Sequence, residues 1–165
     1  MNSKIFDYTK ENPDSKGMGT TFVCAIKTKD YLLYGNIGDS SGYVIKKKKM
    51  HKVTKDHTLV NLLVSTGELS AEEAKYHPRK NVLMRALGAN NPIEIDVFDV
   101  EAKIDGILLC SDGFTNMLTE EQIEKVLAEE KNVEEAVKKL INKANARGGN
   151  DNISIAYLKR ESGDV

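Results

Sequence analysis

Short runs of β-branched and aromatic residues recur along this 165-residue chain, with polar or glycine-containing turns between them. The first four runs form two pairs, and each pair is joined by a charged turn, a pattern typical of β-hairpins. The run at residues 107–110 is apolar at every position, which predicts a strand buried on both faces. We therefore expect strands at residues 20–26, 31–37, 43–45, 50–53, 93–100, 107–110 and 153–158.

Helical signals occupy the ends of the chain and one central block. Residues 2–11 form a short segment with a sparse apolar face, and residues 133–144 repeat apolar side chains at helical spacing. Helix-capping pairs stand at Ser70 and Glu73, at Thr119 and Gln122, and at Asn132 and Glu135. Strands first, then capped helices, then a closing strand indicate an α+β fold in which helices flank antiparallel sheets.

The block at residues 54–88 interrupts the strand pattern. Its two short helical signals lie between strands, and an excursion of about thirty residues is longer than most connections within a domain. No internal repeat or linker divides the rest of the chain. We expect one domain over residues 1–165, with residues 54–88 as a flap subdomain within it.

The overall charge excludes several classes of partner. The 24 basic and 25 acidic side chains give a net charge of −1, so no general field attracts nucleic acid or a membrane surface. No apolar run approaches the roughly 18 residues that a membrane-spanning helix requires. Cys24 and Cys110 both lie in apolar runs, which suits buried free thiols and a reducing cytoplasm.

Three aspartates share one local setting. Asp39, Asp112 and Asp151 each lie at one end of an apolar run and close to glycine. Carboxylates placed in this way suit hard divalent cations such as Mg²⁺ and Mn²⁺, which prefer oxygen ligands. The alternative is that Gly-Asp and Asp-Gly pairs simply form turns, as they do in many proteins. The three together favour a metal site without identifying a reaction.

Five strings in this order resemble the type 2C family of metal-dependent serine/threonine protein phosphatases, in its bacterial form. They are Gly17-Met18-Gly19-Thr20-Thr21, Gly38-Asp39-Ser40, Thr54-Lys55-Asp56-His57, Leu108-Leu109-Cys110-Ser111-Asp112-Gly113 and Gly149-Asn150-Asp151-Asn152. The resemblance implies packed antiparallel sheets flanked by helices, and a Mn²⁺ or Mg²⁺ centre where a metal-bound water hydrolyses phosphoserine or phosphothreonine. It implies Asp112 and Asp151 as metal ligands and Asp39 as a weaker third-metal ligand. A phosphoprotein substrate and an opposing serine/threonine kinase follow from it, and residues 54–88 resemble the family's flap.

The sequence also departs from the family pattern. The family carries a phosphate-binding arginine, an acidic pair, an Asp-Gly-x-Gly-Gly metal string and a general-acid histidine before the string at Gly17, and none of these is present. We therefore expect the family's N-terminal third to be missing and the isolated chain to be inactive. The alternative is a catalytically silent pseudophosphatase that acts as a binding module. Uncovered edges would also favour a homodimer.

Two further sets of residues have simpler interpretations. His57 precedes a predicted helix, so a capping or packing role is favoured over that of general acid. Tyr31, Tyr34 and Tyr43 have strand spacing and are expected to extend their hydroxyls into water.

Overall fold

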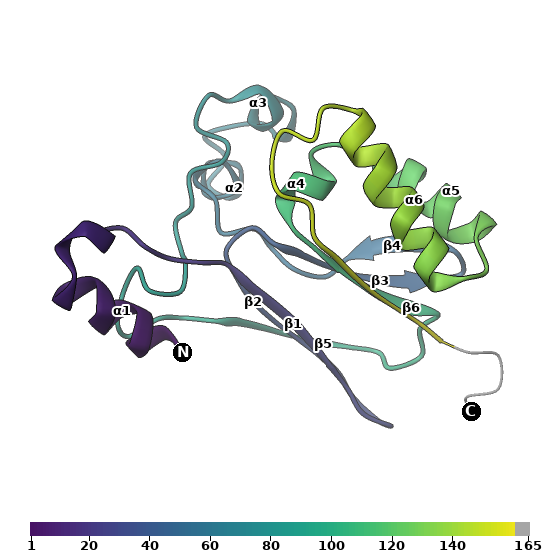
Figure 1. The fold of residues 1–165 in the computed structure, drawn as a ribbon, viewed down its shortest axis with the longest axis horizontal. Helices are drawn as coiled ribbons and strands as arrows, with labels where there is room; N and C mark the ends of the chain where they lie inside the picture. Colours follow the sequence, from purple (N-terminus) through teal and green to yellow (C-terminus); the bar gives the residue numbers. More distant parts are fainter. Residues whose placement is uncertain (161–165) are drawn as a thin grey trace.

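The computed structural model describes residues 1–160, and it places two antiparallel sheets against each other with most of the helices on one side (Figure 1). One sheet has the strand order β1-β2-β5 and the other β4-β3-β6-β7. The strands are β1 (Phe22–Lys27), β2 (Leu32–Ile37), β3 (Ser41–Lys46), β4 (Lys49–Lys52), β5 (Asp96–Val100), β6 (Gly106–Cys110) and β7 (Ile155–Lys159). The expected α+β fold is confirmed, as are both hairpins.

Helices precede, interrupt and follow the strands. They are α1 (Asn2–Glu11), the 3₁₀ turn η1 (Pro13–Ser15), α2 (Leu59–Ser65), α3 (Ala71–Tyr76), α4 (Asp112–Thr115), α5 (Glu120–Glu129) and α6 (Val133–Ala146). The capping pairs at Ser70 and Thr119 both form as predicted, and Asn132 caps α6 by accepting from the amide of Glu135. The short α4 escaped sequence analysis, because four residues are too few to show helical periodicity.

The two central strands of the four-stranded sheet, β3 and β6, are buried on both faces, and their side chains point alternately to one face and the other. On β3, Tyr43 and Ile45 pack with α5 and α6, whereas Val44 faces the other sheet. On β6, Leu108 joins the helical side and Ile107 the side between the sheets. Each buried aliphatic side chain contributes about 1.5–3 kcal/mol. As expected from its all-apolar sequence, β6 is therefore a central strand.

The prediction for two tyrosines was wrong. Tyr34 is fully buried and Tyr43 nearly so. The hydroxyl of Tyr34 donates to the main-chain oxygen of Tyr43 at 2.9 Å, so the protein supplies the partner that we expected from water. This bond ties the two sheets together through β2 and β3.

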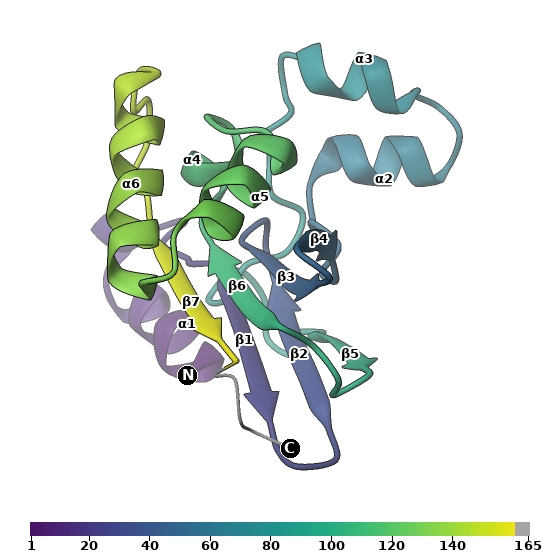
Figure 2. The same ribbon diagram turned by 90° about the vertical axis from the view of Figure 1, so that its right-hand side faces the viewer.

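Residues 54–88 leave the sheets as an excursion, with α2 and α3 lying apart from both sheets in Figure 2. Main-chain bonds close its base, from Leu59 N to Val82 O at 2.9 Å and from Met84 N to His57 O at 2.7 Å. Whether this segment acts as a flap stays a prediction. Within residues 1–160, no helix has the length and apolar character needed to cross a membrane.

Candidate metal centre

Two of the three predicted ligands meet because of strand register. Ser41 on β3 pairs with Cys110 on β6, and Cys110 also pairs with Ile155 on β7. Asp39 lies two residues before Ser41, and Asp112 lies two residues after Cys110. Because these strands are antiparallel, both aspartates lie at the same edge of the four-stranded sheet. Neighbouring strands thus bring together residues that are far apart in the sequence.

The turn that carries Asp39 requires glycine at the preceding position. Gly38 has a φ of +101°, a conformation that side chains disfavour, and a Cβ there would lie 2.3 Å from Cγ2 of Thr21. Its amide donates to Nδ1 of His57 at 3.1 Å, and its carbonyl accepts from the His57 amide at 2.9 Å. Asp39 therefore projects from a turn that is tightly fixed on one side.

The segments carrying Asp112 and Asp151 are joined through Ser111. Its amide donates to Ser154 O at 3.1 Å, and its Oγ accepts from Ser154 N at 3.0 Å. A Cβ on Gly113 would lie 2.5 Å from Asn152 O and 3.2 Å from Cβ of Asp151. Glycine therefore allows the start of α4 to approach the segment before β7 closely.

Asp39 and Asp112 line one open hollow of about 140 Å³. Residues 54–88 contribute Asn61, Lys80 and Asn81 to its walls. Carboxylates from the sheet edge thus face amide and ammonium donors from residues 54–88. Such a mixture of charges suits a cation together with an anion rather than an apolar ligand.

The negative charges of Asp39 and Asp112 repel each other. Burial, together with the smaller effect of the negative charge of Asp112, raises the pKa of Asp39 to about 6. Ionising a partly buried carboxyl group beside a second carboxylate costs free energy unless a cation binds between the two. Mg²⁺ and Mn²⁺ are bound by one or two carboxylates together with waters, so this pair fits such an ion.

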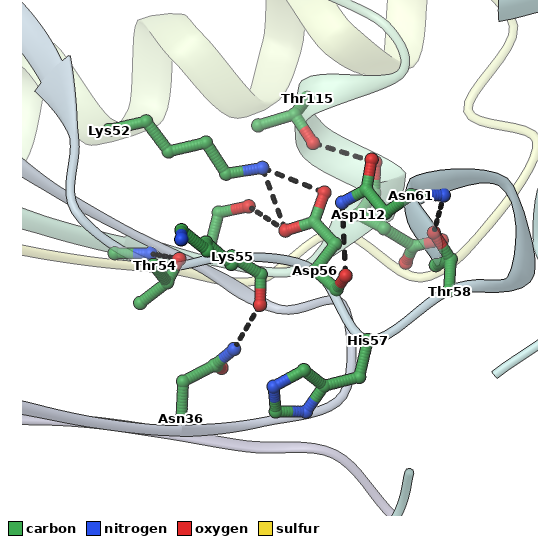
Figure 3. Close-up of polar contacts among 12 residues, drawn as sticks. Asn36, Lys52, Thr54, Lys55, Asp56, His57, Thr58, Asn61, Asp112 and Thr115 are labelled. Atoms are coloured by element: carbon green, nitrogen blue, oxygen red, sulfur yellow. Dashed lines mark hydrogen bonds and ion pairs between the residues drawn. The ribbon is translucent and has the colours of Figure 1, made fainter. Parts of the chain in front are cut away.

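A third carboxylate in the hollow is already paired. Both oxygens of Asp56 lie 2.7 Å from Nζ of Lys52, and Figure 3 shows this fork beside Asp112. Ser41 Oγ approaches the same carboxylate at 3.5 Å. The sequence alone suggested no role for Asp56, although this residue lies in one of the five strings. Its lysine partner makes it less suited to a cation than Asp39 or Asp112.

Asp151 has a different position from the other two. It is exposed, it is not part of the wall of the hollow, and its Oδ1 accepts from Asn152 N at 2.7 Å. Across residues 1–160, no three His, Cys, Asp or Glu side chains converge as a set of metal ligands. The structure thus brings Asp39 and Asp112 together and leaves Asp151 beside them, and metal binding by all three stays a prediction.

His57 does not face the hollow as a general acid would. It is buried, with one ring nitrogen facing Gly38 and the other facing Asp96 on β5. This arrangement agrees with the packing role that the sequence favoured.

Comparison with known proteins gives one consistent result. A family model described as protein phosphatase 2C matches residues 6–154. A serine/threonine phosphatase stp of Listeria welshimeri is 43% identical over 161 residues, which cover 97% of this chain and 64% of that protein. The crystal structure of serine/threonine phosphatase Stp1 from Staphylococcus aureus matches with a TM-score of 0.91 and 33% identity, over 98% of this chain and 64% of that one.

A further solved structure concerns the metal. The catalytic domain of serine threonine protein phosphatase PstP, in complex with two manganese ions, matches with a TM-score of 0.81 and 34% identity. The match covers 93% of this chain and 64% of that domain. The chain thus spans just under two thirds of the length of these relatives.

Proposed function

Because the chain belongs to the protein phosphatase 2C family, we propose that it forms part of the catalytic domain of a serine/threonine protein phosphatase. Its substrates would be proteins carrying phosphoserine or phosphothreonine, and it would oppose a serine/threonine kinase. The observation that supports this most is the pair Asp39 and Asp112, which face one hollow at the sheet edge. A cytoplasmic location stays a prediction.

The residues of the hollow have distinct roles in this proposal. Asp39 and Asp112 would hold Mn²⁺ or Mg²⁺, with Asp151 next to them as a further ligand. When bound, the cation would supply Lewis-acid chemistry to a phosphoryl group and to water. Lys80, on the flap side, would supply positive charge to the phosphate oxygens, and Lys52 would keep Asp56 paired and away from the cation.

Catalysis would require residues beyond those of the hollow. The sequence contains no Asp-Gly-x-Gly-Gly string, and residues 1–160 hold no convergent set of three ligands. We therefore expect hydrolysis only when another segment or chain completes the metal centre.

A phosphothreonine peptide and p-nitrophenyl phosphate, each with Mn²⁺, provide the test. The isolated chain should show no Mn²⁺-dependent turnover, and a version extended with the relatives' preceding segment should be active. In that extended protein Asp112→Asn should lower the rate by more than about a hundredfold, because loss of a residue that only supports a metal ligand already costs up to that factor. An unchanged rate would remove Asp112 from the mechanism.

The alternative function is that of a catalytically silent binding module. The absent Asp-Gly-x-Gly-Gly string favours it. The two possibilities differ in one result, because a silent module would stay inactive in the extended protein while still binding a phosphopeptide. Calorimetry with the phosphopeptide and its unphosphorylated form would detect such binding.

Self-association is a further part of the proposal. Three apolar residues lie on the outer face of the three-stranded sheet, namely Phe22 (43% exposed), Ile26 (59% exposed) and Val97 (68% exposed). Apolar residues at such a face favour contact with a second copy of the chain. Sedimentation equilibrium should show a dimer that Ile26→Lys converts to a monomer. A wild-type monomer at high concentration would refute this contact.

A further inference from the structure

His57 joins three parts of the molecule, two through its buried ring and one through its main chain. Its Nδ1 accepts from Gly38 N, in the turn between β2 and β3. Its Nε2 lies 3.2 Å from Oδ2 of Asp96 on β5, a close polar contact rather than a well-aligned hydrogen bond. Its main-chain oxygen accepts from Met84 N at the base of the flap. Figure 3 shows the ring directed away from Lys52 and Asp112.

The contact with Gly38 is a clamp at two points. The Gly38 amide is buried and needs an acceptor, which the imidazole supplies at 3.1 Å. The Gly38 carbonyl accepts from His57 N at 2.9 Å, and Asn36 Nδ2 approaches it at 3.4 Å. Because Gly38 immediately precedes Asp39, this clamp fixes the backbone from which the Asp39 carboxylate projects.

The far side of the ring fixes which nitrogen can act as the acceptor. Asp96 accepts a hydrogen bond from Nη1 of Arg85 at 2.9 Å, and its other carboxylate oxygen faces Nε2 of His57. Burial alone would raise the pKa of Asp96, but its contacts with His57 and Arg85 outweigh burial, so the net shift is downward. A charged carboxylate next to Nε2 favours the proton on that nitrogen and leaves the lone pair of Nδ1 for Gly38.

We propose that His57 is a positioning residue for Asp39, holding the Gly38 turn so that the carboxylate faces Asp112. The inference rests on the proposed function, since the orientation of Asp39 matters only if the two carboxylates share a cation. Groups that hold a metal ligand in place typically affect metal affinity by about 10–100-fold when they are lost. A residue that only filled space would affect stability and leave that affinity unchanged.

Three substitutions separate these roles by geometry. Asparagine places an oxygen at the position of Nδ1, so His57→Asn keeps an acceptor for Gly38. Glutamine places its polar atoms at the position of Nε2, so His57→Gln leaves the Gly38 amide without a partner. His57→Phe keeps the ring and removes both nitrogens.

Thr54→Val is the matched control. Thr54 is buried, and its Oγ1 accepts from Gly42 N at 2.9 Å. The substitution therefore removes the same kind of bond, from a buried side chain to a glycine amide, at a site away from the Asp39 turn. Its effect on stability should resemble that of His57→Gln.

The first measurement is a Mn²⁺ titration of the full 165-residue chain by calorimetry. Relative to wild type, His57→Gln and His57→Phe should weaken Mn²⁺ binding by about tenfold or more, by the usual effect of such partners. His57→Asn should stay close to wild type, and so should Thr54→Val. If His57→Gln matches Thr54→Val in affinity, the positioning role is overturned.

A second measurement does not depend on metal. Imidazole ¹⁵N shifts at mildly alkaline pH should show the proton of His57 on Nε2, and the Gly38 amide should exchange faster in His57→Phe than in His57→Asn. A proton on Nδ1, or equal exchange in the two variants, would overturn the clamp. Failure of the proposed function has a different signature, because Asp112→Asn would then leave Mn²⁺ binding unchanged while the Gly38 amide behaved as expected.

Discussion

The two sheets of this protein differ in how completely they are covered. The four-stranded sheet lies between α5 and α6 on one face and the other sheet on the second face, and its central residues are buried. The three-stranded sheet buries only its inner face, and its outer face exposes apolar side chains. Asp39 and Asp112 project from the edge of the covered sheet. The candidate metal ligands thus rest on completed packing, whereas the uncovered face is where we propose contact with a second copy.

The largest predicted effect on stability compares a residue packed against the covered sheet with one on the uncovered face of the other sheet. Leu140 of α6 is fully buried against the four-stranded sheet, and Ile26 of β1 is 59% exposed. Leu140→Ala should lower the free energy of unfolding by about 2–5 kcal/mol, because it leaves a cavity. At concentrations where the chain is monomeric, Ile26→Ala should change it by no more than about 0.5 kcal/mol. Urea denaturation measures both, and equal effects would contradict the comparison.

An intermediate effect is expected where the glycines differ in their surroundings. Gly113→Ala would bring Cβ within 2.5 Å of the main-chain oxygen of Asn152, whereas Gly35→Ala would meet only the side-chain sulfur of Cys24 at 3.1 Å. The first should cost about 1–3 kcal/mol, as overpacking against backbone does, and should also weaken Mn²⁺ binding. The second should cost clearly less. Thermal unfolding and Mn²⁺ titration of both variants check this, and a larger loss for Gly35→Ala would refute it.

The smallest predicted effect on stability depends on pH. The pKa of Asp39 is about 6 in the folded chain against 3.8 as its ordinary value, so folding favours the protonated form. Ionised Asp39 therefore costs stability above pH 6, and the cost disappears as the pH falls to 3.8. Asp39→Asn should stabilise the metal-free chain at neutral pH by about 1–2 kcal/mol, a value discounted for partial solvent exposure.

Urea titrations of the wild type and of Asp39→Asn at neutral pH and below pH 3.8 measure that difference. The gain from the substitution should be present only at neutral pH, and added Mn²⁺ should reverse it. A gain that persists in acid would show that it has another cause than the charge of Asp39.

Much of the fold could be predicted from local sequence patterns. Runs of β-branched and aromatic residues joined by charged turns identified the hairpins, and the pairs beginning at Ser70 and Thr119 located two helix starts, because capping chemistry is local. The aspartates at 39 and 112 were found because each follows an apolar run. Their meeting at one edge depends on the register between β3 and β6, which no local pattern determines.

Most of the features that the sequence did not reveal depend on contacts between distant residues. Lys52 is an exception, because it lies only four residues before Asp56 and meets both of its oxygens through a turn that shows no periodic pattern. The partners of His57 come from β5 and from the β2–β3 turn, 39 residues one way and 19 the other along the chain. Tyr34 is buried because a second sheet covers it. The contacts of His57 and Tyr34 arise only after the sheets pack together.

The central claim is that Asp39 and Asp112 share a cation while Asp56 remains paired with Lys52. The direct measurement is a Mn²⁺ titration by calorimetry of three forms of the 165-residue chain, namely wild type, Asp112→Asn and Asp56→Asn. We predict that Mn²⁺ binds the wild type, that Asp112→Asn loses most of the affinity, and that Asp56→Asn keeps most of it. Binding that survives Asp112→Asn but is lost in Asp56→Asn would contradict the account.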